Sequence, residues 1–580
     1  MLRLSHLMWA MLLAFLLWKE IGVLSHTANK SRMTSRLFSQ MPPEETGVAF
    51  RHANGAMGEK EMIETMGSGC ALLDYDNDGK LDIYLVNGAG LPSLSKREPQ
   101  YFNRLYRNEG NFRFSDVTST AGVAGNGYGM GVTAADYDND GFTDLYVTNF
   151  GSNQLLRNGG NGIFVDVTAE AGLGAGGWST SAAFFDYDRD GNLDLYVCRY
   201  LEYELEKQRY CGQPELGWRS YCLPDLFPPA SDLLFRNNGD GSFTDVSLEA
   251  GMARVKGKGL GVTVSDFDRD GWIDIFVAND RTRNFLFRNK GNRTFEEVGL
   301  QTGVALSTDG VARAGMGTDF GDFDQDGWPD LVVSNFETEG LALFRNQGSR
   351  FFRDESGERG LMEASFPYVG FGVRFMDYDN DGWLDVFVVN GHILDDIERY
   401  KPHMTYTQPK LLLRNEGRRF SPVRGASTNS LANLTVGRGA AFGDLDNDGT
   451  IDVVISNNNG PCELLRNDVG SRQNALLLKL VGRKSNRDAF GTRVEVRFMK
   501  GVHTLEAKGA ASYLSSNDPR LHVGLGAATQ VDEVKIHWPS GKLQTLTVLR
   551  AGFLYEISED KGVIQSLRLR SQREFHLQKT

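Results

Sequence analysis

The chain of 580 residues contains only five cysteines and nine histidines. The cysteines lie at positions 70, 198, 211, 222 and 462, and no two of them have the C-x-x-C spacing of zinc or redox sites. The hydrolase motifs G-x-S-x-G and H-E-x-x-H are missing as well. Because these signals of thiol, serine and zinc chemistry are absent, we expect a protein that is not an enzyme.

Long hydrophobic runs are scarce too. The apolar run from Leu7 to Trp18 follows Arg3 and is too short to span a bilayer comfortably, but it suits the h-region of a signal peptide. We expect residues 1–25 to be a signal peptide, and the alternative is an uncleaved N-terminal anchor extending to Leu24. No later segment is apolar enough to cross a membrane. The sequence therefore predicts a secreted or cell-envelope protein whose membrane contact is limited to the N-terminal segment.

Glycine is abundant, with 67 residues against 16 prolines, as expected for many tight turns between short strands. The pattern D-x-D-x-D-G-x-x-D occurs seven times. Its copies begin at Asp74, Asp136, Asp186, Asp266, Asp322, Asp377 and Asp444. Six copies follow a G-x-G, each is followed by an apolar run and then by Arg-Asn, and several repeats end on F-x-D-V-T or a relative. Four short strands in each repeat of about 50 to 60 residues are typical of a propeller blade.

We therefore predict an all-β fold: a seven-bladed β-propeller over residues 26–470, a small β-rich domain over 471–558 and a flexible tail over 559–580. The seventh unit lacks the F-x-D-V-T strand, whereas an unpaired piece from about Leu37 to Phe50 precedes the first loop. We predict that these N-terminal residues complete the last blade, because an open ring would leave strand edges exposed.

The alternating carboxylates of each loop suit a hard cation, because calcium takes six to eight oxygen ligands at about 2.3–2.6 Å. Glycine at the sixth position permits the turn that folds these ligands inward, and the carbonyl of the seventh residue would add a further ligand. We predict Ca²⁺, about one ion per blade, with these ligands: Asp74, Asp76, Asp78, Lys80, Asp82, Asp136, Asp138, Asp140, Phe142, Asp144, Asp186, Asp188, Asp190, Asn192, Asp194, Asp266, Asp268, Asp270, Trp272, Asp274, Asp322, Asp324, Asp326, Trp328, Asp330, Asp377, Asp379, Asp381, Trp383, Asp385, Asp444, Asp446, Asp448, Thr450 and Asp452.

An EF-hand would need a glutamate at position twelve, where all seven loops have Leu, Val or Ile. Two alternatives remain: the loops are ordinary Asp-Gly turns, or the ions have a structural role only. The formal charge of −13 argues against a nucleic-acid partner. Seven divalent ions would bring it to −13 + 14 = +1, so the acidity is better explained by bound metal than by a cationic partner.

The seven loops with their preceding G-x-G resemble the FG-GAP/VCBS repeats of integrin α-chain propellers, in which such loops bind calcium. The Arg-Asn and F-x-D-V-T signatures are similar to those of the cartilage acidic protein family and its bacterial relatives. Beyond residue 470, GAASYLSSNDPRLHVGLG and VKIHWPSG resemble the ASPIC/UnbV domain, which accompanies such propellers. The resemblance implies that each loop binds one calcium ion through its four carboxylates.

These features predict a calcium-stabilised, non-catalytic binding or adhesion scaffold whose partner is an extracellular protein or glycan. Trp178, Trp218 and Tyr221 are candidate contact residues, although core packing would explain them as well. Cys211 and Cys222, close together in the largest insertion, are the best candidate disulfide. The alternative is a polysaccharide-active enzyme with its site in the central pocket of the propeller.

Overall fold

The computed structural model describes residues 36–207, 209–348, 351–425, 428–499 and 501–570, so the expected signal peptide lies outside it. Strands dominate these ranges. The α-helices are single turns, namely α2 (Pro43–Thr46), α3 (Thr118–Ala121), α4 (Gly299–Thr302) and α5 (Leu361–Ser365). In these ranges no helix has the length and apolar character to cross a membrane. The predicted all-β fold is confirmed.

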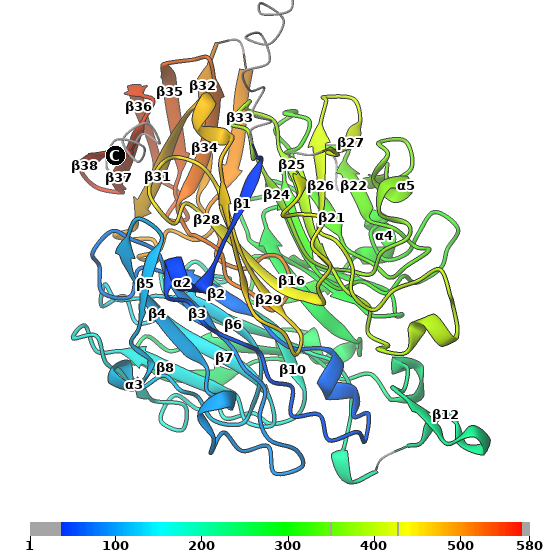
Figure 1. Cartoon of the computed structure of the whole chain (residues 1–580). Coiled ribbons are helices and arrows are strands. Elements are labelled where there is room, and N and C mark those ends of the chain that lie inside the picture. Colours follow the sequence, from blue (N-terminus) through cyan, green and yellow to red (C-terminus); the bar gives the residue numbers. More distant parts are fainter. Residues whose placement is uncertain (1–35, 208, 349–350, 426–427, 500, 571–580) are drawn as a thin grey trace, which may run out of the picture.

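Over the described part of the chain, seven four-stranded antiparallel sheets succeed one another as the blades of a ring (Figure 1). From the innermost strand outward, the first three blades are β2 (Cys70–Leu73), β3 (Asp82–Leu85), β4 (Arg104–Gly110), β5 (Arg113–Asp116); β6 (Tyr128–Ala135), β7 (Asp144–Phe150), β8 (Gln154–Asn158), β9 (Phe164–Asp166); and β10 (Ser179–Phe185), β11 (Asp194–Arg199), β14 (Leu233–Asn237), β15 (Phe243–Asp245). The next three are β16 (Gly259–Ser265), β17 (Asp274–Asn279), β18 (Phe285–Asn289), β19 (Phe295–Glu297); β20 (Thr318–Gly321), β21 (Asp330–Val333), β22 (Ala342–Asn346), β23 (Phe352–Asp354); and β24 (Gly370–Met376), β25 (Asp385–Asn390), β26 (Leu411–Asn415), β27 (Phe420–Pro422). The seventh combines β28 (Gly437–Gly443), β29 (Asp452–Asn457) and β30 (Glu463–Asn467) with β1 (Phe38–Met41).

The ring is closed by the N-terminal strand. β1 pairs antiparallel with β30, with Phe38 opposite Asn467, and so supplies the outer strand of the last blade as predicted. Along the axis each innermost strand contacts that of the next blade, and β28 contacts β2. Between the sixth and seventh blades, Phe38 packs with Phe387 and Phe442 in one buried cluster. β1 thus completes the four-stranded sheet of the last blade, which packs against the first blade.

After β30 the chain forms two further four-stranded sheets, drawn in orange and red in Figure 1. One contains β31 (Asn474–Val481), β34 (Leu521–Gly526), β37 (Phe553–Ser558) and β38 (Gly562–Arg568), and the other contains β32 (Arg493–Phe498), β33 (Gly501–Glu506), β35 (Gln530–His537) and β36 (Leu543–Arg550). The sheets share a buried core that includes Leu478, Val496, Ile536 and Trp538. This pairing of two sheets around one core is the small β domain expected from the sequence.

Strand β38 corrects the prediction of a flexible tail from residue 559 onward. It pairs antiparallel with β37, Phe553 lying opposite Arg568. The side chains of β38 are mostly exposed, so the sequence shows no alternation of buried and exposed positions there, and backbone hydrogen bonds to β37 hold the strand. Residues 571–580 lie outside the described chain.

A segment of the C-terminal domain fills the centre of the propeller. We call residues 510–518, between β33 and β34, the axial plug. Its hydrogen-bond partners on the innermost strands are Cys70, Leu72, Val132, Ser181, Thr263, Thr318 and Phe442. Tyr513 is fully buried, its ring centroid lies 5.0 Å from that of Phe371, and its hydroxyl donates to the Met66 carbonyl. The plug therefore contacts the innermost strands of all seven blades.

The largest insertion lies on the face of the ring away from the C-terminal domain, at the lower right of Figure 1. It forms a hairpin of β12 (Cys211–Gln213) and β13 (Trp218–Ser220), which the disulfide Cys211–Cys222 joins as predicted. Among the described residues the other three cysteines are free.

Replacing Phe38 by alanine is expected to lower the free energy of unfolding by about 3–5 kcal/mol, because it removes a buried ring from the closing strand. Urea unfolding followed by tryptophan fluorescence measures the loss. Gln40→Ala, exposed on the same strand, is the control and should change the stability by less than about 0.5 kcal/mol. Equal effects of the two substitutions would show that β1 does not close the ring.

Candidate metal centres

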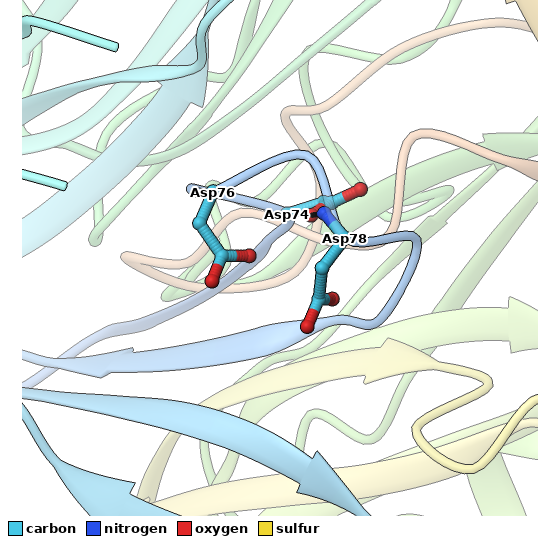
Figure 2. Close-up of side chains that lie close together, drawn as sticks. All are labelled: Asp74, Asp76 and Asp78. Carbon is cyan, nitrogen blue, oxygen red and sulfur yellow. Dashed lines mark hydrogen bonds between the residues drawn. The ribbon is translucent and has the colours of Figure 1, made fainter. Parts of the chain in front are cut away.

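The seven Asp-rich loops join the innermost strand of each blade to its second strand, so they lie together on one face of the ring. Their backbones are alike. The fourth residue of each loop has φ between 57° and 60°, and the glycine at the sixth position has φ between 83° and 100°. The two left-handed residues have one residue between them, and together they reverse the direction of the chain. Glycine adopts the left-handed conformation without strain. Figure 2 shows the result in the first loop, where Asp74, Asp76 and Asp78 project from a single turn.

The ninth residue of each loop is a buried aspartate that accepts two backbone hydrogen bonds. In the first loop, Oδ2 of Asp82 accepts from the Tyr75 amide at 3.0 Å and Oδ1 accepts from the Asn108 amide at 2.7 Å. The same pair of bonds occurs in the other six loops. This carboxylate therefore fixes the loop to the third strand of its own blade.

The aspartates are numbered by their position in the nine-residue loop, namely first, third, fifth and ninth. The first and third aspartates carry the oxygens that face one another. In the first loop one oxygen each of Asp74, Asp76 and Asp78 lies within 4.8 Å of the others, and in the second to fifth loops the first, third and ninth aspartates are grouped in this way. Several of these oxygens are buried and accept no hydrogen bond. They are Oδ1 of Asp76, Asp188, Asp266, Asp322, Asp324, Asp379 and Asp446.

Burial and mutual repulsion make these carboxylates costly without a counter-ion. Burial, followed by the charge of Glu506, raises the pKa of Asp266 to about 7. Burial and the charges of Asp326 and Asp324 raise the pKa of Asp322 to about 7. A cation among the grouped oxygens would offset both the desolvation and the repulsion. Because the donors are all oxygens and several lack a partner, the residues fit a hard metal ion.

An arginine that was not predicted as a site residue completes most of these centres. Arg107 Nε donates to Oδ2 of Asp76 at 2.6 Å, and Arg288 Nε donates to Oδ2 of Asp268 at the same distance. Arg345 Nε binds Oδ2 of Asp324 in the same way, whereas Arg414 binds Oδ2 of Asp379 through Nη2 at 3.1 Å. Each arginine belongs to the repeated Arg-Asn pair, so the signal was present in the sequence. In Asp76, Asp324 and Asp379 the other oxygen, Oδ1, is buried and has no hydrogen-bond partner.

The asparagine of the same pair links neighbouring blades. Asn289 Nδ2 donates to the Ile273 carbonyl of its own loop and to the Tyr187 carbonyl of the preceding loop, at 3.2 and 2.8 Å. The corresponding bonds to the preceding loop are made by Asn108, Asn158, Asn237, Asn346, Asn415 and Asn467. Asn108 reaches the seventh loop, so the seven bonds form a closed circle.

A second set of contacts leads from each loop to the next. The fourth residue donates to the carbonyl of the glycine in the following loop, as from Asn77 to Gly141 at 2.8 Å, and Asn447 closes the circle at Gly79. In the third and fourth loops this residue is an arginine whose guanidinium lies over the tryptophan of the next loop, at 4.3 Å for Arg269 over Trp328. The metal loops are thus held by their neighbours on both sides.

In each of the first five loops the structure groups three of the four predicted carboxylates within 4.8 Å of one another. The residue at position seven of each loop takes a different visible role. Its amide donates to the fifth aspartate, as from Trp272 to Asp270 at 3.0 Å, and metal ligation through its carbonyl stays a prediction. Of the aromatic contact candidates, Trp178 and Tyr221 are buried, so core packing accounts for them. Trp218 is 39% exposed on the β12–β13 hairpin.

Replacing Asn289 by alanine is expected to lower the free energy of unfolding by about 2–4 kcal/mol, because a buried and a half-buried carbonyl lose their donor. Chemical unfolding measures this change. Asn292→Ala, an exposed turn residue in the same blade, is the control and should leave the stability nearly unchanged. A loss no larger than that of the control would contradict the role of the asparagine circle.

Comparison with known proteins agrees with this architecture. The family described as "FG-GAP-like repeat" matches residues 74–147, 136–197, 226–277, 266–333 and 322–388, and the family described as "ASPIC and UnbV" matches residues 482–564. Cartilage acidic protein 1 of Mus musculus is 27% identical over 531 residues, which cover 85% of this chain and 74% of the relative. The Homo sapiens protein of that name is 27% identical over 512 residues, covering 83% and 70%.

A solved structure, YCF48 bound to D1 peptide, is 8% identical with a TM-score of 0.40 and covers 72% of this chain and 96% of its own. The family matches fall on the loops and on the C-terminal sheets described above. The chain belongs to the FG-GAP-repeat proteins that carry a C-terminal ASPIC and UnbV domain, and it is similar to cartilage acidic protein 1.

Proposed function

We propose that the protein is an exported calcium-binding scaffold with about one Ca²⁺ ion in each blade. The observation that carries this proposal is the set of buried carboxylate oxygens without hydrogen-bond partners, repeated around the ring. Calcium suits them because it is a hard cation that accepts many oxygen ligands in flexible geometry, whereas zinc and copper sites favour nitrogen and sulfur. In each loop the first, third, fifth and ninth aspartates would hold the ion, with the seventh carbonyl as a further ligand.

Export is supported by two features of the chain. The apolar run from Leu7 to Trp18 has the length of a signal-peptide core, and the disulfide Cys211–Cys222 is typical of an oxidising compartment. The protein would then meet calcium concentrations that keep its loops loaded. We place it outside the cytoplasm, secreted or held at the cell envelope.

A non-catalytic role in binding or adhesion is supported by the filled centre of the propeller. A polysaccharide-active enzyme with a central site would need an open axial pocket lined by two free carboxyl groups. The axial plug instead packs Tyr513 and Leu514 against Met130, Met316 and Phe371. Partners would therefore be bound on the outer surfaces, where the β12–β13 hairpin presents Trp218, Leu216 and Tyr210 to solvent. The partner class that suits these surfaces is an extracellular protein or glycan.

Thermal unfolding of the chain in excess EDTA and then in millimolar calcium tests the proposal. Calcium is expected to raise the midpoint strongly and titration to count about seven bound ions, because each loop gains its counter-ion only in the folded state. Magnesium at the same concentration is the control and should act weakly, since it demands a smaller octahedral site. The absence of any calcium-specific rise would mean that the loops are ordinary turns.

A single-loop variant sharpens this test. Asp446→Asn preserves the shape of a side chain that is 4% exposed and has an unpartnered oxygen, but removes one ligand charge from the seventh loop. The number of tightly bound ions should fall by one. Asp240→Asn, outside the loops and exposed, should leave the number unchanged.

A further inference from the structure

A cavity of about 120 Å³ lies between the loop face of the propeller and the C-terminal domain. Apolar side chains form much of its wall, among them Phe375, Phe442 and Leu505. Four guanidinium groups reach it: Arg269 from the fourth loop, Arg374 from β24, Arg493 from β32 and Arg520 from just before β34. A space of this size is large enough for several water molecules or one small polyatomic ion.

Arg374 has no hydrogen bond or ion pair with any described residue. Its Nη1 is buried without a partner, and its nearest ring contact is Phe442, 5.9 Å from the centroid. Burial lowers the pKa of this guanidinium below its ordinary value. Arg374 is half-buried, and the charges of Asp319 and Asp518 offset only part of the cost of removing its guanidinium from water, since Nη1 makes no hydrogen bond.

Other buried arginines of the same fold show what is missing at Arg374. Arg438 donates four hydrogen bonds to backbone carbonyls, including those of Thr65 and His392. Arg520 is chelated by Asp518 and also donates to Asn447 Oδ1 at 2.6 Å. Arg438 and Arg520 are thus paired by acceptors from the surrounding chain, whereas Arg199 Nε and Arg313 Nη1 are, like Arg374 Nη1, buried without a partner.

Arg269 and Arg493 also line the cavity, and their like charges repel each other. Nε of Arg269 is buried without a partner, and Arg493 has only a 3.4 Å contact with Glu495. Like charges gathered around one cavity are the arrangement expected of an anion site without its anion.

Three carboxylates on the cavity wall also have other partners, and two of them, Asp319 and Asp518, act favourably on the charge of Arg374. Asp319 pairs with Lys508 at 2.9 Å, and Asp518 pairs with Arg520. Glu506 accepts a hydrogen bond from the Ser265 hydroxyl at 2.5 Å.

The remaining three wall carboxylates are the first aspartates of the fifth, sixth and seventh loops, namely Asp322, Asp377 and Asp444. Each accepts the amide of the glycine in its own loop, at 2.9, 2.8 and 2.7 Å. Their remaining capacity is directed to the metal centres described above.

We propose that this cavity binds a small oxyanion of the sulfate or phosphate class, held by Arg374 with Arg269 and Arg493. Planar guanidinium groups suit such an anion because they present paired N–H donors that match its oxygens. The anion would contact the propeller and the C-terminal domain together and so stabilise their contact. The proposal rests on the cavity and its arginines and holds whichever metal the loops bind.

Thermal unfolding of the full chain in millimolar calcium tests it, with sodium sulfate or sodium phosphate added at constant ionic strength. A saturable rise of the midpoint at low millimolar anion is expected for at least one of the two, and their comparison identifies the source. Arg374→Met keeps the length of the side chain and should abolish the saturable rise. Arg418→Met, an exposed arginine in the same blade, should retain it. The unsaturable stabilisation that sulfate gives to most proteins appears in all variants and is subtracted.

Two outcomes would overturn the proposal. One is a wild-type protein with no saturable response to either anion. The other is a response that persists unchanged in Arg374→Met, which would place the anion elsewhere. Should that variant fail to fold, Arg269→Gln provides the same comparison, and isothermal titration of the same anions gives a reading independent of stability.

Discussion

A buried aspartate at the end of every metal loop is the constraint on which the rest of the protein depends. Its two oxygens accept amides from the start of the loop and from the asparagine of the third strand, so one side chain joins the loop to the second and third strands of its blade. That asparagine then reaches the preceding loop and joins one blade to the next. Hydrogen bonds of this kind are worth most when buried, because leaving either partner unsatisfied is costly. The circle of blades and the geometry of the loops therefore have the same origin.

The same arrangement creates the need for a cation. Once the ninth aspartate has fixed the loop, the first and third aspartates are brought within a few ångströms of each other and partly removed from water. An arginine on the third strand binds one oxygen of the third aspartate, and other carboxylate oxygens of the group remain buried without a hydrogen-bond partner. A backbone fixed in this way would let a cation bind without further ordering of its ligands.

The C-terminal domain limits which surfaces of the propeller a ligand can reach. Propellers commonly leave a channel along the axis, but here the axial plug fills it with Tyr513 and Leu514 and bonds to the inner strands. The face with the metal loops is covered by the same domain, and the cavity with Arg374 lies within that contact. Surfaces for large partners are left on the outer sides and on the face with the disulfide-linked hairpin. The two parts of the chain are therefore one structural unit, since the plug completes the core of the propeller.

The sequence by itself determined the blades, the loops and the positions of their carboxylates, because these depend on local patterns that repeat seven times. Spacing of aspartates, a glycine for the left-handed turn and short apolar runs are sufficient to define each loop and its strands. Even the closing strand could be predicted, since the last repeat lacks one strand and the N-terminus offers one. The role of Arg107 and its equivalents and the axial position of residues 510–518 were decided only in the tertiary structure. So were the burial of Trp178 and Tyr221 and the pairing of β38. Each of these depends on contacts between residues far apart in the chain, and no local pattern of hydrophobicity or spacing records such contacts.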